Sequence, residues 1–284
     1  MMMIWFLEEG QLLKINRILA DQHMHTCFSF DSKASPEDMI KSAIEKGLRF
    51  ISITDHYDMK CLDYEEDGIF DAEEYFKTLL PLKEKYQDRL QINIGIELGL
   101  QSDYADFFSN LLKKYPFEFI IGSTHVIEKR DPAFGYDFKY HSDQQVYQKY
   151  LEEEYKNIKS FKNFHVLGHL DYVIRYGNKM QESFCYDYHK EIIDLILKEL
   201  IDTERGIEIN TAGIKYGLKH PHPGRKILER YKALGGDILT IGSDAHDPSR
   251  IGNEFVTASR YAKDCGFKYY TIFRGGNREF YQLP

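Results

Sequence analysis

Short apolar runs alternate along the chain with longer segments in which apolar residues recur at helical spacing. The runs lie at residues 18–20, 50–53, 92–96, 117–121, 166–167, 207–209 and 238–241. Short runs rich in β-branched residues are typical of buried parallel strands. The pattern therefore predicts a unit of one strand and one helix that is repeated about seven times.

The helical segments carry recognisable start and stop signals. Ser35 and Pro36 offer an N-cap and a proline at the first helical position, and Gly47 ends that helix. Asp71 caps a second helix that extends to residue 87, in which Pro81 should introduce a kink or a break. Further helices are predicted at residues 143–161, 187–202, 224–234 and 248–264.

The alternation of strands and helices indicates a closed or nearly closed α/β barrel. The chain of 284 residues is long for one domain, but such barrels use this length as a single unit. Hydrophobic residues make up 43% of the chain and aromatic residues 14%, which is enough for a large core. We therefore predict a single-domain barrel, with a doubly wound open sheet as the alternative.

The net charge and the spacing of the cysteines limit the binding partners and the cellular location that the chain is expected to have. The formal net charge of −8 argues against a nucleic-acid-binding surface, which needs a basic stripe. A small phosphorylated substrate stays compatible, because bound cations reverse the sign of the local field. The four cysteines are scattered without a CxxC pair, as in reduced cytosolic proteins. No signal peptide and no apolar run of membrane-spanning length is recognised, so we expect a cytoplasmic protein without a membrane partner.

Histidine and acidic residues follow the predicted strands, and among the histidines only His189 lies in a predicted helix. In chain order they are Asp21, His23, His25, Asp31, Asp55, His56, Glu97, His125, His169, Asp171, Glu208, Asp244 and His246, with the amide of Asn210 beside Glu208. The carboxyl ends of parallel strands meet at one rim of a barrel. These side chains are therefore expected to line one pocket.

The residue types indicate a metal site. His23 and His25 alternate with one residue between them, so an extended backbone directs both imidazoles to the same face. Imidazole with carboxylate, and no cysteine nearby, suits Zn, Mn or Fe. Each residue alone has a structural alternative: a capped turn for Asp55 and His56, core packing for His125 and His169, an ion pair for Glu97, and a helix cap for Asp171. Their shared position after strands favours the metal site.

The remaining histidines carry less functional signal. His165 and His189 are expected to be structural or on the surface, because one begins a strand and the other lies in a helix. His220 and His222 flank Pro221 in a loop and could line a pocket, but exposure to solvent is the favoured expectation.

The order of these motifs resembles that of the polymerase-and-histidinol-phosphatase (PHP) superfamily. The matching motifs lie at His23-x-His25, Thr54-Asp55-His56, Gly95-Ile96-Glu97, Ser123-x-His125, Gly168-His169-x-Asp171 and Ser243-Asp244-Ala245-His246. The segment Glu208-Ile209-Asn210-Thr211-Ala212-Gly213 and the position of Arg175 are similar to the PHP-type histidinol phosphatases. The resemblance implies a distorted (β/α)7 barrel that hydrolyses L-histidinol phosphate to L-histidinol and phosphate. Two departures are Asp31, where some members carry His, and an N-terminal extension at residues 1–17.

The resemblance implies three divalent metal ions, of Zn, Mn or Fe. His23, His25, Glu97 and Asp244 would hold the first. Glu97, as a bridge, with His125 and His169 would hold the second, and Asp31, His56 and His246 the third. A hydroxide between the first two ions would attack phosphorus in line.

Several roles around the ions stay open at this stage. Glu97 and Asp244 are assigned to catalysis as metal-holding carboxylates, and Asp171 or His141 would protonate the leaving group, unless Asp55 and Asp171 orient imidazoles. Arg175 is expected to bind the phosphate oxygens, with a surface ion pair as its structural alternative. Glu208 and Asn210 are expected near the substrate, and Glu208, Tyr136 or Tyr140 would recognise its imidazole.

Two other functions compete with the phosphatase. One is a PHP phosphoesterase of different specificity, such as a 3′–5′ exonuclease acting on nucleotides or nucleic-acid ends, and the acidic chain argues against it. The other is a non-catalytic module that only binds metal, which ranks last because every expected ligand position is filled. The oligomeric state stays open.

Overall fold

A nearly closed parallel barrel forms the centre of the computed structural model, which describes residues 17–284. The strands are β1 Ala20–Asp21, β2 Phe50–Ile53, β3 His56–Asp58, β4 Gln91–Gly99, β5 Phe119–Ser123, β6 Val166–Leu167, β7 Gly206–Asn210, β8 Leu239–Gly242, β9 Tyr269–Arg274 and β10 Asn277–Gln282. Strands β1, β2, β4, β5, β6, β7 and β8 pair in that order, all parallel, and β3 pairs with the end of β4. Each of the seven apolar runs forms one of these parallel strands, which confirms the predicted rhythm.

The two ends of this sheet approach each other. Gln22 N–H donates to the Ile241 carbonyl at 3.2 Å, and His25 N–H donates to the Ala245 carbonyl at 2.8 Å. Asp244 N–H returns a bond of 2.8 Å to the His23 carbonyl. The residues that follow β1 and β8 are therefore joined, and the doubly wound open sheet is excluded as the fold.

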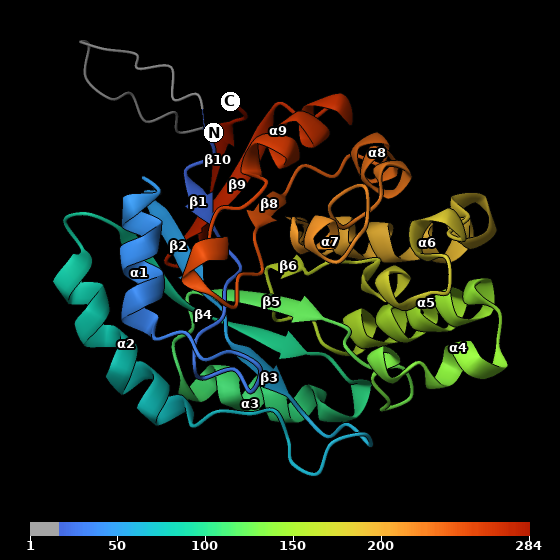
Figure 1. The fold of residues 1–284 in the computed structure, drawn as a ribbon, viewed down its shortest axis with the longest axis horizontal. Helices are drawn as coiled ribbons and strands as arrows, with labels where there is room; N and C mark the ends of the chain where they lie inside the picture. Colours follow the sequence, from blue (N-terminus) through green and yellow to red (C-terminus); the bar gives the residue numbers. More distant parts are fainter. Residues whose placement is uncertain (1–16) are drawn as a thin grey trace.

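Helices surround the strands, as Figure 1 shows. They are α1 Pro36–Glu45, α2 Ala72–Tyr86, α3 Ala105–Lys114, α4 Tyr136–Tyr140, α5 Asp143–Ser160, α6 Tyr186–Asp202, α7 Ala212–Lys215, α8 Arg225–Ala233 and α9 Phe255–Asp264. Every residue of β5, β7 and β8 is buried, because the barrel interior covers one face of these strands and the helices cover the other. Among residues 17–284, no helix has the length and apolar character needed to cross a bilayer.

The predicted capping signals act as expected at two helices. The Ser35 hydroxyl accepts the Asp38 N–H at the start of α1, and Gly47 adopts a φ of +74° just after its end. Asp71 accepts two backbone N–H groups at the start of α2. Pro81 was expected to kink this helix or to split it in two, and the split is wrong. Pro81 lies on the exposed face of α2, which runs unbroken from Ala72 to Tyr86.

Some elements were absent from the prediction. Strand β3, helix α3 and the antiparallel β9–β10 hairpin all lie outside the predicted runs. The helix predicted at 248–264 begins only at Phe255, after a short 3-10 turn at Pro248–Arg250. The predicted N-terminal extension lies outside the described residues, apart from Arg17.

Candidate metal centre

Glu97 stands at the centre of a group of buried imidazoles. Its side chain, at the end of β4, is fully buried. Glu97 Oε2 lies 2.8 Å from His56 Nδ1 and 3.3 Å from His23 Nε2. Glu97 Oε1 lies 3.0 Å from His169 Nε2 and 3.3 Å from His125 Nε2. Burial alone would raise the pKa of Glu97, but the surrounding imidazoles hold it well below its usual range, so this carboxylate is ionised.

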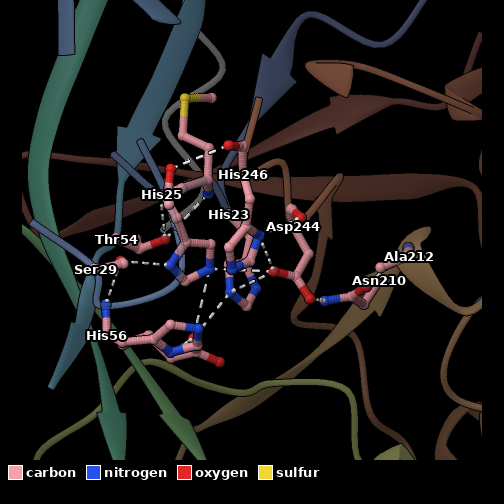
Figure 2. A network of polar contacts seen from close by, with 12 residues as sticks. His23, His25, Ser29, Thr54, His56, Asn210, Ala212, Asp244 and His246 are labelled. Carbon is pink, nitrogen blue, oxygen red and sulfur yellow. Dashed lines mark hydrogen bonds and ion pairs between the residues drawn. The ribbon is translucent and has the colours of Figure 1, made fainter. Parts of the chain in front are cut away.

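His25 and Asp244 extend the group toward the seam between β1 and β8. His25 Nε2 lies 3.1 Å from Asp244 Oδ1 and 3.6 Å from Glu97 Oε2. Figure 2 shows the His25 ring between Ser29 and Asp244, with Asn210 on the far side of Asp244. Asp244 has a φ of +53°, a left-handed conformation that is uncommon outside glycine and accumulates at functional sites.

A third set of side chains lies on the outer side of His25. The rings of His56 and His246 both stack on the His25 ring, with centroids 4.1 Å away. His246 Nε2 is 3.1 Å from Asp31 Oδ2, and His56 Nε2 is 3.8 Å from the same oxygen. The structure thus brings together the nine predicted ligands: His23, His25, Asp31, His56, Glu97, His125, His169, Asp244 and His246.

Several imidazoles are oriented through the nitrogen that faces away from the centre. His23 Nδ1 lies 2.8 Å from Glu208 Oε1, and His125 Nδ1 lies 2.7 Å from Asp58 Oδ1. A hydrogen bond to one ring nitrogen fixes the tautomer and the orientation of the ring. The other nitrogen, Nε2, then presents its lone pair to the centre.

Asp55 orients His25 through a serine. The Ser29 hydroxyl donates to Asp55 Oδ1 at 2.7 Å and lies 3.0 Å from His25 Nδ1. Because this hydroxyl gives its proton to Asp55, it accepts the N–H of His25. Burial, and then the neighbouring His246 and His56 rings, hold the pKa of His25 well below its usual value. The His25 ring is therefore neutral, which is the form that binds metal.

The residues fit bound metal ions. Five buried ligand atoms have no hydrogen-bond partner among the described residues: His23 Nε2, His25 Nε2, His56 Nδ1, Glu97 Oε2 and His169 Nδ1. A buried polar atom without a partner costs about 1–3 kcal/mol. Within the described part of the chain, four groups of three ligand atoms lie close enough to share an ion, and all of them belong to this centre. Coordination of cations would satisfy the unpaired atoms that face these groups.

A cavity of about 490 Å³ opens from this centre to the surface. Its inner wall includes His125, His169, Asp244 and Arg175. Its outer wall is acidic and aromatic, with residues Phe30, Tyr64, Glu65, Glu66, Asp67 and Asp131. A larger cavity of about 810 Å³ lies between α9 and the residues that follow α1, but no group of metal-ligand side chains within residues 17–284 lines it.

Residues 21–212, which carry most of this centre, match the family model of the PHP domain. The chain belongs to the PHP domain family. The PHP chain is also similar to a probable histidinol-phosphatase of Clostridium acetobutylicum, at 32% identity over 87% of this chain and 94% of the relative. It is similar to the histidinol-phosphatase of Lactococcus lactis at 30% identity, over 90% of this chain and 94% of that one.

Solved structures of histidinol phosphatases are also similar to this chain. The PHP chain superposes on the crystal structure of histidinol phosphate phosphatase from Lactococcus lactis, in complex with zinc, L-histidinol and phosphate, with a TM-score of 0.82 and 28% identity. The match covers 93% of this chain and 99% of that one. A putative histidinol phosphatase from Listeria monocytogenes has the same fold at a TM-score of 0.70 and 21% identity.

The other predicted site residues are distributed around the centre. Arg175 lines the cavity. Glu208 and Asn210 lie beneath the ligands: Glu208 contacts His23, and Asn210 Nδ2 donates to Asp244 Oδ2 at 3.3 Å. Both are fully buried, behind rather than within the cavity wall.

The two candidates for the leaving-group acid differ in position. Asp171 is buried, and its two oxygens accept from His222 Nδ1 at 2.5 Å and from Gly224 N–H at 2.7 Å. His141 is exposed and does not line the cavity. Tyr140 is also exposed and outside the cavity wall, and the side chain of Tyr136 lies outside the described residues.

Sequence reasoning missed three residues around the centre. Asp58 and Ser29 each contact the outer nitrogen of a ligand histidine, and His222 pairs with Asp171. The prediction that His222 is exposed is wrong, since only 1% of its surface is accessible. His222 is buried because its backbone pairs with that of Asn210 and its ring forms a hydrogen bond with Asp171. The interval of one residue between His56 and Asp58 was the available signal for Asp58.

Proposed function

We propose that this chain hydrolyses L-histidinol phosphate to L-histidinol and phosphate. The observation that carries the proposal is a single cavity that joins a ligand-rich metal centre to Arg175 and ends in an acidic, aromatic outer wall. The similarity to histidinol-phosphatases over about nine-tenths of the chain supports the same activity. Membership of a biosynthetic enzyme family and four free cysteines support a cytoplasmic location.

Three divalent ions, of Zn, Mn or Fe, are proposed for the centre. We assign His23, His25, Glu97 and Asp244 to the first, Glu97, His125 and His169 to the second, and Asp31, His56 and His246 to the third. Such ions act as Lewis acids on phosphoryl oxygens and lower the pKa of bound water. The zinc in the related Lactococcus lactis structure supports this type of ligand set.

The residues around the metal centre are proposed to bind the phosphate group or to position the metal ligands. Arg175 is proposed to bind the phosphate oxygens, because its planar guanidinium offers two parallel N–H donors. Glu208, Asp58 and Ser29 hold ligand imidazoles in place, as their distances to Nδ1 atoms support. Asp171 holds the loop that carries His222 and Gly224, so its oxygens favour a positioning role over proton donation.

The outer wall of the cavity suits the organic part of the substrate. L-Histidinol carries an ammonium group and an imidazole, which together form a small cationic aromatic unit. Glu65, Glu66 and Asp67 supply negative charge at the wall, and Phe30, which is 60% exposed, supplies an open ring face. A nucleic-acid end would instead place further phosphates against these acids, and this disfavours the exonuclease.

The test is phosphate release from L-histidinol phosphate, compared with sugar phosphates and nucleotides, after loading the protein with Zn, Mn or Fe. We expect a strong preference for L-histidinol phosphate and complete loss of activity on chelation. Equal turnover across the panel, or turnover of nucleotides alone, would refute the substrate assignment and leave a phosphoesterase of another specificity.

A further inference from the structure

Three tyrosines surround the guanidinium of Arg175. The Arg175 Cζ atom lies 3.9 Å from the ring centre of Tyr172, 4.2 Å from that of Tyr216 and 4.8 Å from that of Tyr176. Arg175 Nη2 also donates to the Tyr176 hydroxyl at 2.6 Å. Tyr172 and Tyr176 belong to the same 3-10 helix as Arg175, at Tyr172–Tyr176, whereas Tyr216 follows α7. We call Tyr172, Tyr176 and Tyr216 the tyrosine cage.

The cage stabilises the cation without neutralising it. No ion pair joins Arg175 to a carboxylate among the described side chains, and its Nε atom is buried without a hydrogen-bond partner. Arg175 is half-buried, and arginines that are largely removed from water are usually paired with an acid. Aromatic ring faces attract the guanidinium through their quadrupoles, yet they leave its N–H donors and its charge available to an anion.

The cage also sets the distance between Arg175 and the metal centre. The Tyr172 ring lies 4.8 Å from the His169 ring and 5.6 Å from the His125 ring, measured between centroids. The Tyr176 hydroxyl donates to that of Tyr172 at 2.8 Å, which ties the two rings together. The Tyr172 ring therefore contacts both the guanidinium and two metal-ligand imidazoles, and so links Arg175 to the metal centre.

We propose that the tyrosine cage positions Arg175 as an unpaired anion receptor for the phosphoryl group, at a fixed distance from the metal centre. All three tyrosines and Arg175 line the cavity that the metal centre opens into. The inference rests on the proposed function only in naming the anion as the phosphate of the substrate. Tyr216 is the most exposed member, at 41%, and it can be replaced with the least disturbance of the core.

Substitution of Tyr216 tests the cage. Tyr216→Leu removes the ring face, Tyr216→Phe keeps it, and Tyr269→Leu is a matched control at an exposed tyrosine of β9. The probe is inorganic phosphate, measured by calorimetry on the zinc-loaded protein and as a competitive inhibitor. We expect Tyr216→Leu to weaken phosphate binding roughly 3- to 30-fold and to raise KM more than it lowers kcat. Tyr216→Phe and Tyr269→Leu should stay within about twofold of the parent.

Zinc content and melting temperature separate positioning from folding. Both should be unchanged in Tyr216→Leu, and Tyr176→Phe, which removes the acceptor of Arg175 Nη2, should also weaken phosphate binding. Unchanged phosphate affinity in Tyr216→Leu, or a loss that parallels zinc content, would overturn the cage. Phosphate binding needs no L-histidinol phosphate. The two hypotheses can fail separately. If Tyr216→Leu loses phosphate affinity but the parent protein hydrolyses a different ester, the role of the tyrosine cage is supported and only the substrate assignment is wrong.

Discussion

At the scale of single residues, one carboxylate connects most of the centre. Glu97 contacts His23, His56, His125 and His169 from a fully buried position. Glu97→Gln keeps the shape but removes the charge that these imidazoles share with bound cations. We expect Glu97→Gln to lose bound zinc and its activity to fall at least about 100-fold. Residues that only orient metal ligands typically change activity about 10- to 100-fold when they are substituted. Steady-state kinetics and metal analysis measure both. Glu73→Gln, on the exposed face of α2, is the control, and normal zinc content in Glu97→Gln would contradict the assignment.

Asp58 should act on the metal through His125. Its carboxylate fixes the Nδ1 side of that ring at 2.7 Å, and Asn in its place holds the position without the charge. We expect Asp58→Asn to lower zinc affinity or activity about 10- to 100-fold, because the imidazole becomes a weaker and less ordered ligand. Competition with a chelator measures the affinity. Asp103→Asn changes a surface ion pair with Lys129 and should have no effect. Equal zinc affinity in the two variants would remove Asp58 from the centre.

The ligands were predictable from the sequence because they lie at the carboxyl ends of the parallel strands or in the loops that follow, where the topology fixes the side of the barrel that they reach. The residues that hold these ligands in place were not predictable from the sequence. Ser29 contacts His25 from four residues along the same loop, and Asp58 contacts His125 from β3, but the strand pattern encodes neither pairing. Arg175 was predicted near phosphate, but the tyrosine cage depends on Tyr216, which is 41 positions away in the chain and meets Arg175 only in the folded barrel.

At the scale of elements, His165 joins β5 to the β9 strand of the C-terminal hairpin. Its Nδ1 accepts the Ile120 N–H at 3.0 Å, and its ring packs between Phe119 and Phe273. Burial lowers the pKa of His165 from 6.5 to about 4. The unfolded chain therefore binds a proton that the folded chain excludes. Stability is lost as pH falls from about 6.5 toward 4, by up to about 1.4 kcal/mol per pH unit.

Denaturant unfolding at pH 7 and pH 5 checks this dependence. His165→Asn offers an amide oxygen to the same N–H but does not titrate in this range. The free energy of unfolding should therefore fall less between the two pH values in His165→Asn than in the parent. His141→Asn, at an exposed histidine, should behave as the parent does. Identical pH slopes in His165→Asn and the parent would show that His165 does not contribute.

The same elements show where pattern analysis succeeds and fails. Strands buried on both faces are continuous apolar runs, so all seven barrel strands were found. Strand β10 is the opposite case: it is mostly exposed, and its sequence Asn277-Arg278-Glu279-Phe280-Tyr281-Gln282 carries little apolar signal. It forms because it pairs with β9 across the Gly275-Gly276 turn, where both glycines have positive φ.

At the scale of the whole molecule, bound metal should stabilise the fold. The centre draws ligands from six of the seven barrel strands and the loops after them, so ions that bind only the folded chain shift the unfolding equilibrium. At metal concentrations about 100 times Kd the gain is about 2.7 kcal/mol, which for a chain of this size corresponds to roughly 5–10 °C in Tm. Treatment with a chelator should lower Tm by roughly 5–10 °C and abolish activity, and added zinc should restore both Tm and activity. An unchanged Tm after verified metal removal would contradict the multi-strand centre.

The contact between the two ends of the barrel has a consequence for synthesis of the protein. His23 and His25 follow the first barrel strand, whereas Asp244 and His246 lie in the loop after the last one. The backbone bonds between these two loops bring the four side chains together. A growing chain therefore holds unmatched ligands until translation has passed residue 246. A product that terminates early has most of the ligand residues but no complete centre. Hydrolytic activity is thus expected only of chains that have been made past residue 246, so termination before that point yields an inert protein rather than an unregulated phosphatase.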